Sequence, residues 1–503
     1  MKVLSFRVSL AAGALIALAG CYSNNGGFID LDGGVGSVIP PGGNSDGGPG
    51  GAGGAGGTGG ADGGVGGAGG TGGDGGGGSA GTGGAGGDPL TGQWQPPVVI
   101  ESHEGTGLNP KAAIGTNGDA FAVWVQSSLG EHRVWANRRA SMNGWEGAAL
   151  LGTTDGNAMD PTQTSQPDVV VDAAGIATAA WGSFSDPVVR GLLSRRYVAP
   201  DGWGDQGTLY DGASTAGDAR LAVDGDGYVM AVFETGTGAW ANHFDPAVGW
   251  GDAAIIDNEP GTPRGIQVGL HPDGTGWAVW SQAPTGIGYN IFGNQFVPES
   301  GWSEASKVEE GTMASSFEPQ LAASANGNTL FAWQRTAGLA YHVWSNAWDA
   351  ESGELTEPVR LDRTGTAYAP AVAVDPQGNG TAVWLQSAQV NGAMLQVAAS
   401  RYTSGRGWGA PSVLAEGEIT SEPRVAMDSR GNAIVVYTEQ LPQEDQVDAW
   451  AHTYSAGQWS AAVLLGLDER TGSAFQPSVA MSPDGRAVVV WREGPDIWAT
   501  TFE

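Results

Sequence analysis

The sequence of 503 residues contains few cysteines, lysines and histidines. Its one cysteine, Cys21, excludes an internal disulfide, so packing and hydrogen bonds must hold the fold together. The six histidines are scattered and lack the spacing of a zinc site, and lysine occurs only as Lys2, Lys111 and Lys307. With 22 basic and 53 acidic residues the net charge is −31, which argues against nucleic acid as a partner.

A hydrophobic run long enough to span a membrane is also missing. The apolar stretch at residues 8–19 follows Lys2 and Arg7 and is too short for a bilayer, which is typical of a signal peptide. It ends in Leu18-Ala19-Gly20-Cys21, which resembles a bacterial lipobox. The resemblance implies a signal peptide at 1–20, lipidation of Cys21 and a membrane anchor. An ordinary secretory signal with an accidental cysteine is the alternative.

The lipobox resemblance also gives an expected location. Tyr22, rather than Asp, follows the cysteine, which by the sorting rules of bacterial lipoproteins implies an outer-membrane lipoprotein that faces the periplasm or the cell surface. Residues 21–90 are dominated by glycine and cannot bury enough apolar surface to fold, so we expect a lipid-anchored, disordered tether. The folded part is expected at residues 91–503.

Residues 91–503 repeat themselves at intervals of about fifty residues, as propeller blades do. Each unit has a turn glycine, at positions Gly118, Gly175, Gly227, Gly274, Gly327, Gly378, Gly431 and Gly485. Six residues later comes an aromatic residue: Trp124, Trp181, Phe233, Trp280, Trp333, Trp384, Tyr437 and Trp491. Apolar alternation on both sides of the turn, followed by a third strand and a Gly-Trp turn, predicts four short strands in each unit.

The expected fold is therefore all-β: a single β-propeller of eight blades, with seven blades as the alternative. The eighth unit stops after its third strand, while the folded region opens with a segment, residues 92–100, that matches the missing fourth strand. We expect this segment to pair with the last strand of the chain and so close the ring.

The blades resemble sialidase-like bacterial propeller repeats of the BNR or Asp-box type. The match is architectural over residues 91–503, because the turn aspartates here stand three residues before the glycine, and not two. The catalytic set of that family consists of an arginine triad, a Tyr/Glu pair and an acid. No arginine recurs in this sequence at the strand positions that such a triad would need. The resemblance implies the fold and says little about chemistry.

The periodic aromatic residues and turn aspartates are expected to be structural. The aromatic residues should pack between neighbouring blades. The aspartates should cap their own turns, with calcium binding as the alternative; they are Asp172, Asp224, Asp375 and Asp428. No cofactor and no metal site are expected otherwise.

Candidate binding residues lie at the roots of the long connections opposite the turns, which we call the loop face. One set stands two residues beyond the periodic aromatic residue: Gln126, Gln282, Gln386, Glu439 and Glu493. The other stands just before the first-strand proline: Asn109, Gln166, Glu318, Glu422 and Gln476. These side chains are expected either to surround the mouth of the central channel as a glycan or cation site, or to hydrogen-bond the loops.

The sequence thus predicts a monomeric surface module that binds carbohydrate or protein without catalysis. One alternative is a glycoside hydrolase or lyase with paired carboxylates at the channel mouth. The other is a structural envelope protein without a small ligand.

Overall fold

The computed structural model describes residues 89–141, 143–154, 165–183, 191–212, 214–286, 288–309, 314–363, 365–387, 394–441, 445–467 and 472–503. The predicted signal peptide, Cys21 and nearly all of the predicted tether lie outside these ranges. Within them the chain forms strands, turns and bends without a helix. The described residues therefore include no helix that is long and apolar enough to cross a membrane.

The strands fall into sets by their position in each repeat. The innermost strands are β2 (Thr106–Ile114), β7 (Asp168–Val171), β12 (Arg220–Val223), β17 (Arg264–Leu270), β22 (Ser316–Ala323), β27 (Thr366–Val374), β32 (Arg424–Met427) and β37 (Ala474–Met481). The second strands are β3 (Ala120–Ser128), β8 (Ala177–Ser183), β13 (Val229–Thr235), β18 (Gly276–Gln282), β23 (Thr329–Ala337), β28 (Gly380–Ser387), β33 (Ala433–Gln440) and β38 (Ala487–Glu493).

Farther from the centre lie the third and outermost strands. The third strands are β4 (Glu131–Ala140), β9 (Gly191–Val198), β14 (Gly238–Asp245), β19 (Asn290–Val297), β24 (Ala340–Asp349), β29 (Leu395–Thr403), β34 (Val447–Ser455) and β39 (Asp496–Phe502). Short strands follow the third strands: β5 (Gly144–Trp145), β10 (Gly202–Trp203), β15 (Gly249–Trp250), β20 (Gly301–Trp302), β25 (Glu354–Leu355), β30 (Gly407–Trp408) and β35 (Gln458–Trp459). The outermost strands are β6 (Ala149–Thr153), β11 (Gly207–Tyr210), β16 (Ala254–Ile255), β21 (Ser306–Lys307), β26 (Val359–Arg360), β31 (Ser412–Ile419), β36 (Val463–Leu464) and β1 (Val98–Val99).

Hydrogen bonding divides the described strands into six sheets of four or five strands and one of ten. Neighbouring strands within a unit pair antiparallel, as expected for successive hairpins. The ten-stranded sheet contains two innermost strands, β27 and β32, and arises because the end of β31 pairs with β33 of the following unit.

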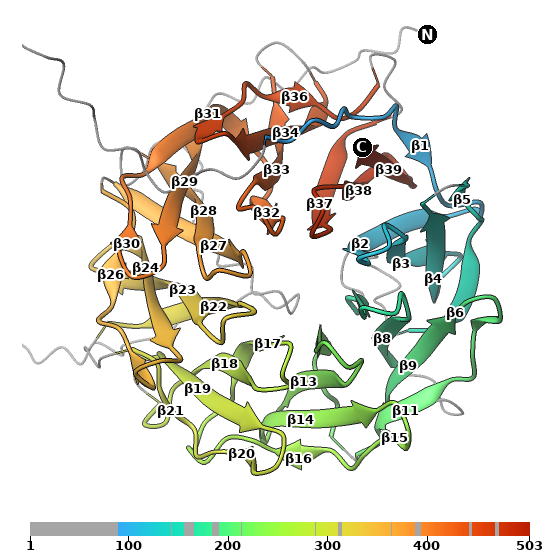
Figure 1. The fold of residues 1–503 in the computed structure, drawn as a ribbon. Coiled ribbons are helices and arrows are strands. Elements are labelled where there is room, and N and C mark those ends of the chain that lie inside the picture. Colours follow the sequence, from blue (N-terminus) through green and yellow to red (C-terminus); the bar gives the residue numbers. More distant parts are fainter. Residues whose placement is uncertain are drawn as a thin grey trace, which may run out of the picture. The chain divides into compact units, whose positions relative to one another are not determined.

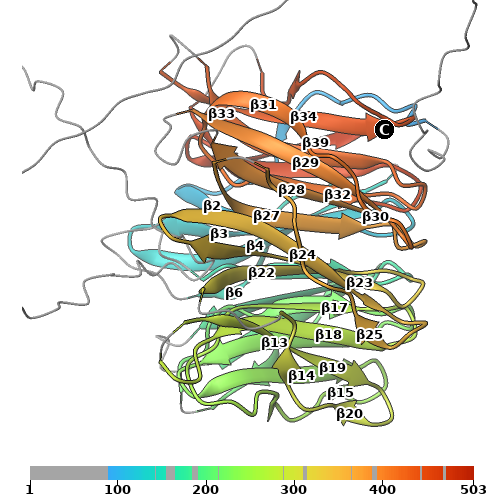
Figure 2. The same ribbon diagram turned by 90° about the vertical axis from the view of Figure 1, so that its left-hand side faces the viewer.

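The innermost strands contact one another in chain order, and β37 contacts β2, so the circle of contacts is complete. Figure 1 shows the sheets arranged radially around a central axis, which is the arrangement of a β-propeller, and Figure 2 shows the ring edge-on. We call the space along this axis, bordered by the innermost strands, the channel. The predicted closure is confirmed: β1 pairs with β39, with Val98 opposite Ala499 and Val99 opposite Trp498. The first described strand thus forms the outer edge of the last sheet.

The core lies between neighbouring sheets. The eight periodic aromatic residues are all buried, with exposed fractions of 1% or less, which confirms their predicted packing role. One apolar cluster joins Val123 and Val134 of the first unit to Trp181 of the next. Another joins Trp124 and Ile100 to Val490 of the last unit, so the ends of the chain share a core as continuous as that of any other pair of sheets.

The turns between the first and second strands hold their own shape and also contact each other. In one turn, Oδ1 of Asp172 accepts hydrogen bonds from the backbone N–H groups of Ala174 and Ile176, both at 2.9 Å, and Gly175 takes a φ of 82° that favours glycine. The capping role predicted for this aspartate is confirmed. From the last turn, Arg486 donates to the carbonyl of Asn117 in the first turn.

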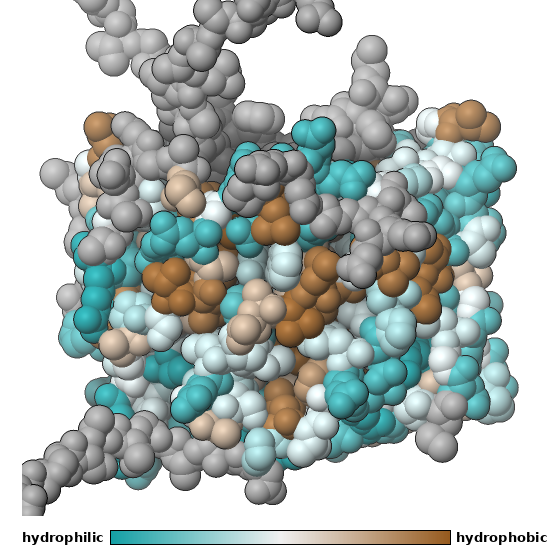
Figure 3. Space-filling view, turned by 90° about the horizontal axis from the view of Figure 1, so that it is seen from above, coloured by the Kyte–Doolittle hydropathy of each residue, from teal (hydrophilic) through white to brown (hydrophobic). Residues whose placement is uncertain are grey.

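The outer rim carries scattered apolar side chains on a hydrophilic background, as Figure 3 shows over the side of the ring that contains β31, β36 and β1. Val98, Val99, Val413 and Val463 are 37–51% exposed there. Because most of the outermost strands are only two residues long, they offer little free backbone for pairing with another chain.

Candidate functional site

The innermost strands present two series of equivalent positions to the channel. We call the residues nine positions before each turn glycine the mouth ring: Asn109, Gln166, Asp218, Gly265, Glu318, Ala369, Glu422 and Gln476. We call those seven positions before it the second ring: Lys111, Asp168, Arg220, Gln267, Gln320, Ala371, Arg424 and Ser478. Each second-ring residue pairs with the equivalent residue of its second strand, for example Lys111 with Val123 and Arg424 with Val436.

Backbone geometry fixes the mouth ring. Asn109, Glu318 and Gln476 have φ values of 52°, 50° and 53°, a left-handed conformation that side chains other than Asn, Asp and Gly rarely adopt. The register of the innermost strand shifts at each of these residues, which marks a β-bulge. The bulge sets the direction in which these three side chains leave their strands.

Several ring residues link neighbouring units. Oδ1 of Asp218 accepts a hydrogen bond from the backbone N–H of Gln166 at 2.9 Å, and Oδ2 of Asp168 accepts one from Leu221 at 3.0 Å. Arg424, the first residue of β32, forms an ion pair with Glu422 just before that strand, with Nη2 and Oε2 2.8 Å apart. Part of each ring therefore supports the channel wall.

Two arginines of the second ring, Arg220 and Arg424, act electrostatically on its lysine, Lys111. Burial, together with the positive charges of Arg220 and Arg424, lowers the pKa of Lys111 to about 8, against the opposite effects of Asp168 and Glu422. Neither β12 nor β32 neighbours β2 in the ring, so these charges act between units that are not adjacent. Arg220 is only 8% exposed, and its Nη1 has no hydrogen-bond partner among the described residues.

Burial raises the pKa values of three acidic groups, Glu318, Glu234 and Asp218. For Glu318, burial and the negative charge of Glu422 raise the pKa to about 8 against the opposing effect of Arg424. Burial likewise raises the pKa of Glu234 to about 7, although the N–H of Ile266 donates to this carboxylate. Burial also raises the pKa of Asp218. Groups that titrate near neutral pH are typical of sites that bind charged ligands or transfer protons.

The predicted residues beyond the periodic aromatic residue lie inside the sheets instead. Gln126, Gln282 and Gln386 each accept a hydrogen bond from the indole N–H two residues earlier, at 2.7–3.0 Å, and Glu493 does the same for Trp491. Burial raises the pKa of the fifth member of this set, Glu439. The structure thus separates the two predicted sets, because four of the five residues of the first set bond to an indole of their own strand and the second set stands at the mouth-ring positions.

Two members of this buried set also hold the loop-face connections. Nε2 of Gln282 donates to the carbonyls of Glu259 and Gly261, at 2.8 and 3.0 Å, and Nε2 of Gln126 donates to that of His103. Hydrogen bonding to the loops, one of the two predicted roles, is therefore what the geometry of these two glutamines favours.

The described residues contain no group of three or more His, Cys, Asp or Glu side chains placed to hold a metal ion. The turn aspartates use Oδ1 for two backbone N–H groups, at Asp224, Asp375 and Asp428 as at Asp172. Calcium binding at these turns remains a prediction. The described residues contain no cluster of acidic side chains that would complete such a site.

The cations of the second ring were missed by sequence reasoning. Lys111, Arg220 and Arg424 all stand seven residues before their turn glycine, and the same position in successive repeats occupies the same place in each unit. This shared position in the repeat could have been used to find them. It was hidden because its members differ from unit to unit, whereas the proline and the turn glycine recur.

No known family model matches this sequence, and no curated protein is similar to it at the level of sequence. Solved structures with a related arrangement include a protein of unknown function from Dyadobacter fermentans, 12% identical with a TM-score of 0.40, which covers 82% of this chain and 99% of that one. The polysaccharide lyase Uly1 is 10% identical with a TM-score of 0.45, over 78% and 89% of the two chains. The intramolecular trans-sialidase from Ruminococcus gnavus is 11% identical with a TM-score of 0.37, over 66% and 93%. Similarity this remote carries no inference about ligand or reaction.

Proposed function

We propose that this chain is a carbohydrate-binding propeller whose channel mouth, on the loop face, binds a saccharide with carboxylate groups. The observation that carries the proposal is the electrostatic effect of Arg220 and Arg424 on Lys111, together with the unpartnered Nη1 of the buried Arg220. Arginine and lysine bind carboxylates through charge-assisted hydrogen bonds. The chain has a net charge of −31, so most of its surface repels an acidic ligand, whereas these three positive charges attract one locally.

The rest of the two rings suits a polyhydroxylated ligand. Asn109, Gln166 and Gln476 have side-chain amides, which both donate and accept hydrogen bonds, as sugar hydroxyls do. Ala369 and Ala371 leave the wall of one unit without a polar side chain. The channel therefore has a charged side and a less polar side, which favours one orientation of a bound chain.

Binding is tested by calorimetric titration of the purified protein with oligogalacturonates and, for comparison, neutral cello-oligosaccharides. Lys111→Met and Arg424→Gln should each weaken oligogalacturonate binding about tenfold, since each removes one charge-assisted contact. Arg406→Met, a loss of one exposed charge at the turn before β30, should leave it unchanged. Equal affinity for charged and neutral oligosaccharides would refute a carboxylate site.

A second candidate, cleavage of the glycan by acid–base catalysis, is favoured by the shifted pKa values of Glu318, Glu234 and Lys111. Glu318→Gln keeps the shape and removes the proton transfer. Reducing-end release from polygalacturonate that stops in this variant, while binding persists, would establish catalysis. If the unaltered protein releases no reducing ends from a panel of acidic glycans, cleavage is refuted and binding without catalysis is the function that stands.

For the architecture we propose a ring of eight blades of the Asp-box-like type, in which β1 supplies the fourth strand of the last blade. Its support is the complete circle of innermost strands and the pairing of β1 with β39. An experimental map in which β27 and β32 belong to one blade would leave seven blades and refute the eight-bladed ring.

For the location we propose an outer-membrane lipoprotein anchored through Cys21. The proposal rests on the lipobox-like residues 18–21 and on the glycine-rich stretch that follows. Cys21→Ser should release the protein from the membrane fraction, and mass spectrometry should find acyl chains on the amino-terminal peptide. A membrane-bound Cys21→Ser protein would contradict it.

A further inference from the structure

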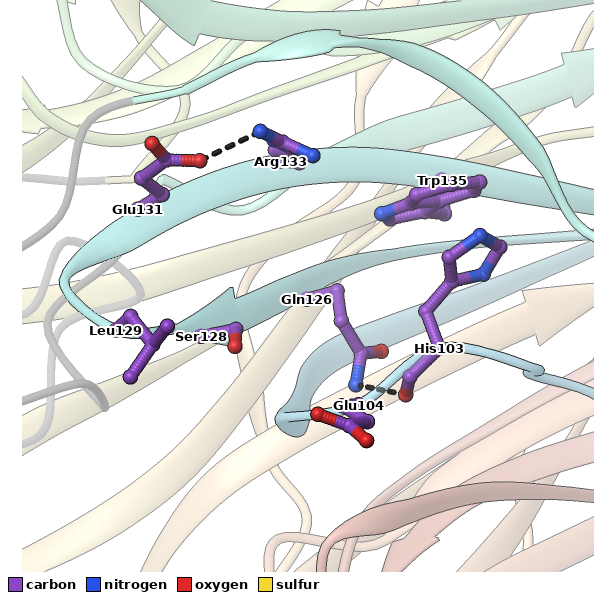
Figure 4. Close-up of a pocket in the computed structure, with 8 residues that line it drawn as sticks. All are labelled: His103, Glu104, Gln126, Ser128, Leu129, Glu131, Arg133 and Trp135. Carbon is purple, nitrogen blue, oxygen red and sulfur yellow. Dashed lines mark hydrogen bonds and ion pairs between the residues drawn. The ribbon is translucent and has the colours of Figure 1, made fainter.

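A hollow opens outside the channel, on the loop face of the first unit. It has a volume of about 240 Å³ and lies between the connection from β1 to β2 and the hairpin formed by β3 and β4 (Figure 4). His103 and Glu104 line it from the connection, and Trp135 and Arg133 from the hairpin. Its lining shares no residue with the mouth ring or the second ring.

One wall of the hollow is held in place by several contacts. Gln126, which is 4% exposed, donates from Nε2 to the carbonyl of His103 at 3.2 Å and accepts the indole N–H of Trp124 at 3.0 Å. The backbone N–H of His103 donates to Glu101 at 2.9 Å, and its ring packs on that of Trp135 with centroids 3.7 Å apart. Because both the backbone and the ring of His103 are fixed, the wall is formed before any ligand arrives.

The tip of the hairpin forms another side of the hollow. Leu129 and Gly130 form the turn, with φ values of 52° and 83°. Asn, Asp and Gly favour this geometry, whereas leucine is strained in it. Leu129 is nevertheless fully exposed to solvent. A strained and exposed apolar side chain at the edge of a hollow points to a contact that the isolated chain does not satisfy.

The polar groups at the rim include both donors and acceptors. Nη2 of Arg133 contacts Oε2 of Glu131 at 2.5 Å, and the two side chains are 48% and 68% exposed. Glu104 faces the same space from the opposite connection (Figure 4). An exposed ion pair of this kind is weak, so a ligand can displace it at little cost.

We propose that this hollow is a second saccharide site, which takes one uncharged sugar ring. The apolar C–H face of the ring would pack on His103 and Leu129, and its hydroxyls would bond to Arg133, Glu131 and Glu104. The two carboxylates disfavour an acidic sugar, and the volume falls below that of sites for whole drug-sized ligands, which matches a single ring. This proposal rests on the proposed function only for the ligand class. Together, the hollow and the channel would let one glycan bind at two points.

The test uses the purified full chain and the methyl glycosides of glucose, galactose, mannose and N-acetylglucosamine, followed by saturation-transfer NMR and titration. At least one glycoside should bind, and Arg133→Ala and His103→Ala should each weaken it about tenfold. Leu129→Ser should weaken it as well. Leu339→Ser is the matched control, since Leu339 is 94% exposed at the tip of the hairpin of β23 and β24, outside both sites.

The channel variant Lys111→Met separates the two proposals, because it should abolish the preference for oligogalacturonate and leave methyl glycoside binding intact. Circular dichroism confirms that each variant is folded. If no methyl glycoside binds, or if binding persists unchanged in folded Arg133→Ala and His103→Ala, the second site is refuted, whatever the channel binds.

Discussion

Asn109 and Gln476 join the first and the last innermost strands through two reciprocal hydrogen bonds. The backbone N–H of Asn109 donates to Oε1 of Gln476 at 3.0 Å, and Nε2 of Gln476 donates to Oδ1 of Asn109 at 2.6 Å. At the outer rim the pairing of β1 with β39 joins the same two units. The chain is therefore closed on itself both at the channel and at the rim.

Removal of the closing strand should destabilise the whole ring. A chain that begins at residue 101 loses Ile100, which is 3% exposed, and Trp94, whose ring lies 5.3 Å from that of Phe502. Loss of these two side chains and of the pairing with β39 should lower the free energy of unfolding by at least about 3–5 kcal/mol, measured by urea denaturation.

The control for this truncation is a chain that begins at residue 89, which keeps β1 and should unfold like the full chain. Size-exclusion chromatography adds an independent readout, because an unpaired β39 is an exposed edge that promotes association. Equal stability of the two truncated chains would show that β1 does not close the ring.

Gln282 should contribute to stability and not to binding. It is fully buried, accepts the indole N–H of Trp280 at 2.7 Å and donates to the connection that follows β16. Gln282→Met would leave these buried partners unpaired and should cost about 1–3 kcal/mol in the free energy of unfolding. Gln267→Met, a change of the same chemistry at a half-buried second-ring residue, should cost much less. A loss of oligogalacturonate binding in folded Gln282→Met would contradict the assignment.

Gln282 and Gln476 illustrate which features the sequence predicts and which it does not. The spacing of Trp280 and its equivalents predicted the buried aromatic residues, the hairpins and the closing segment, because each depends on local periodicity. Gln282 and Gln476 look alike as recurrent polar residues near a loop. Only the three-dimensional arrangement shows that the first points between sheets to an indole and the second points to Asn109 at the channel. Arg220 and Arg424 act on Lys111 from units that are not adjacent to its own, and no one-dimensional pattern brings distant units together.

Binding of a carboxylate ligand should weaken as pH rises through about 8. The pKa of Lys111 is lowered to about 8, so its positive charge is present below that pH and is lost above it. Glu318 becomes ionised over the same range and adds repulsion. Calorimetric affinities between pH 6 and 9 should therefore fall, and the fall should be shallower in Lys111→Met. A profile that is flat in the unaltered protein would rule out a role for Lys111.

Glu318 also makes stability depend on pH with a definite sign. Its pKa is raised from 4.5 to about 8, so between these values the folded protein holds a proton that the unfolded chain has lost. This contribution to stability is therefore fully present below pH 4.5 and is lost as pH rises to about 8. Glu318→Gln cannot ionise, so its melting temperature relative to the unaltered protein should increase from pH 5 to pH 8. A constant difference would contradict the raised pKa.

The most direct measurement is an experimental structure of the protein soaked with a short oligogalacturonate. We expect a carboxylate of the ligand within hydrogen-bond distance of Arg220, with Lys111 and Arg424 close to the same ligand. An oligogalacturonate that lies elsewhere, with the channel free of it while Lys111, Arg220 and Arg424 keep their present contacts, would contradict the proposal that the channel mouth is the binding site.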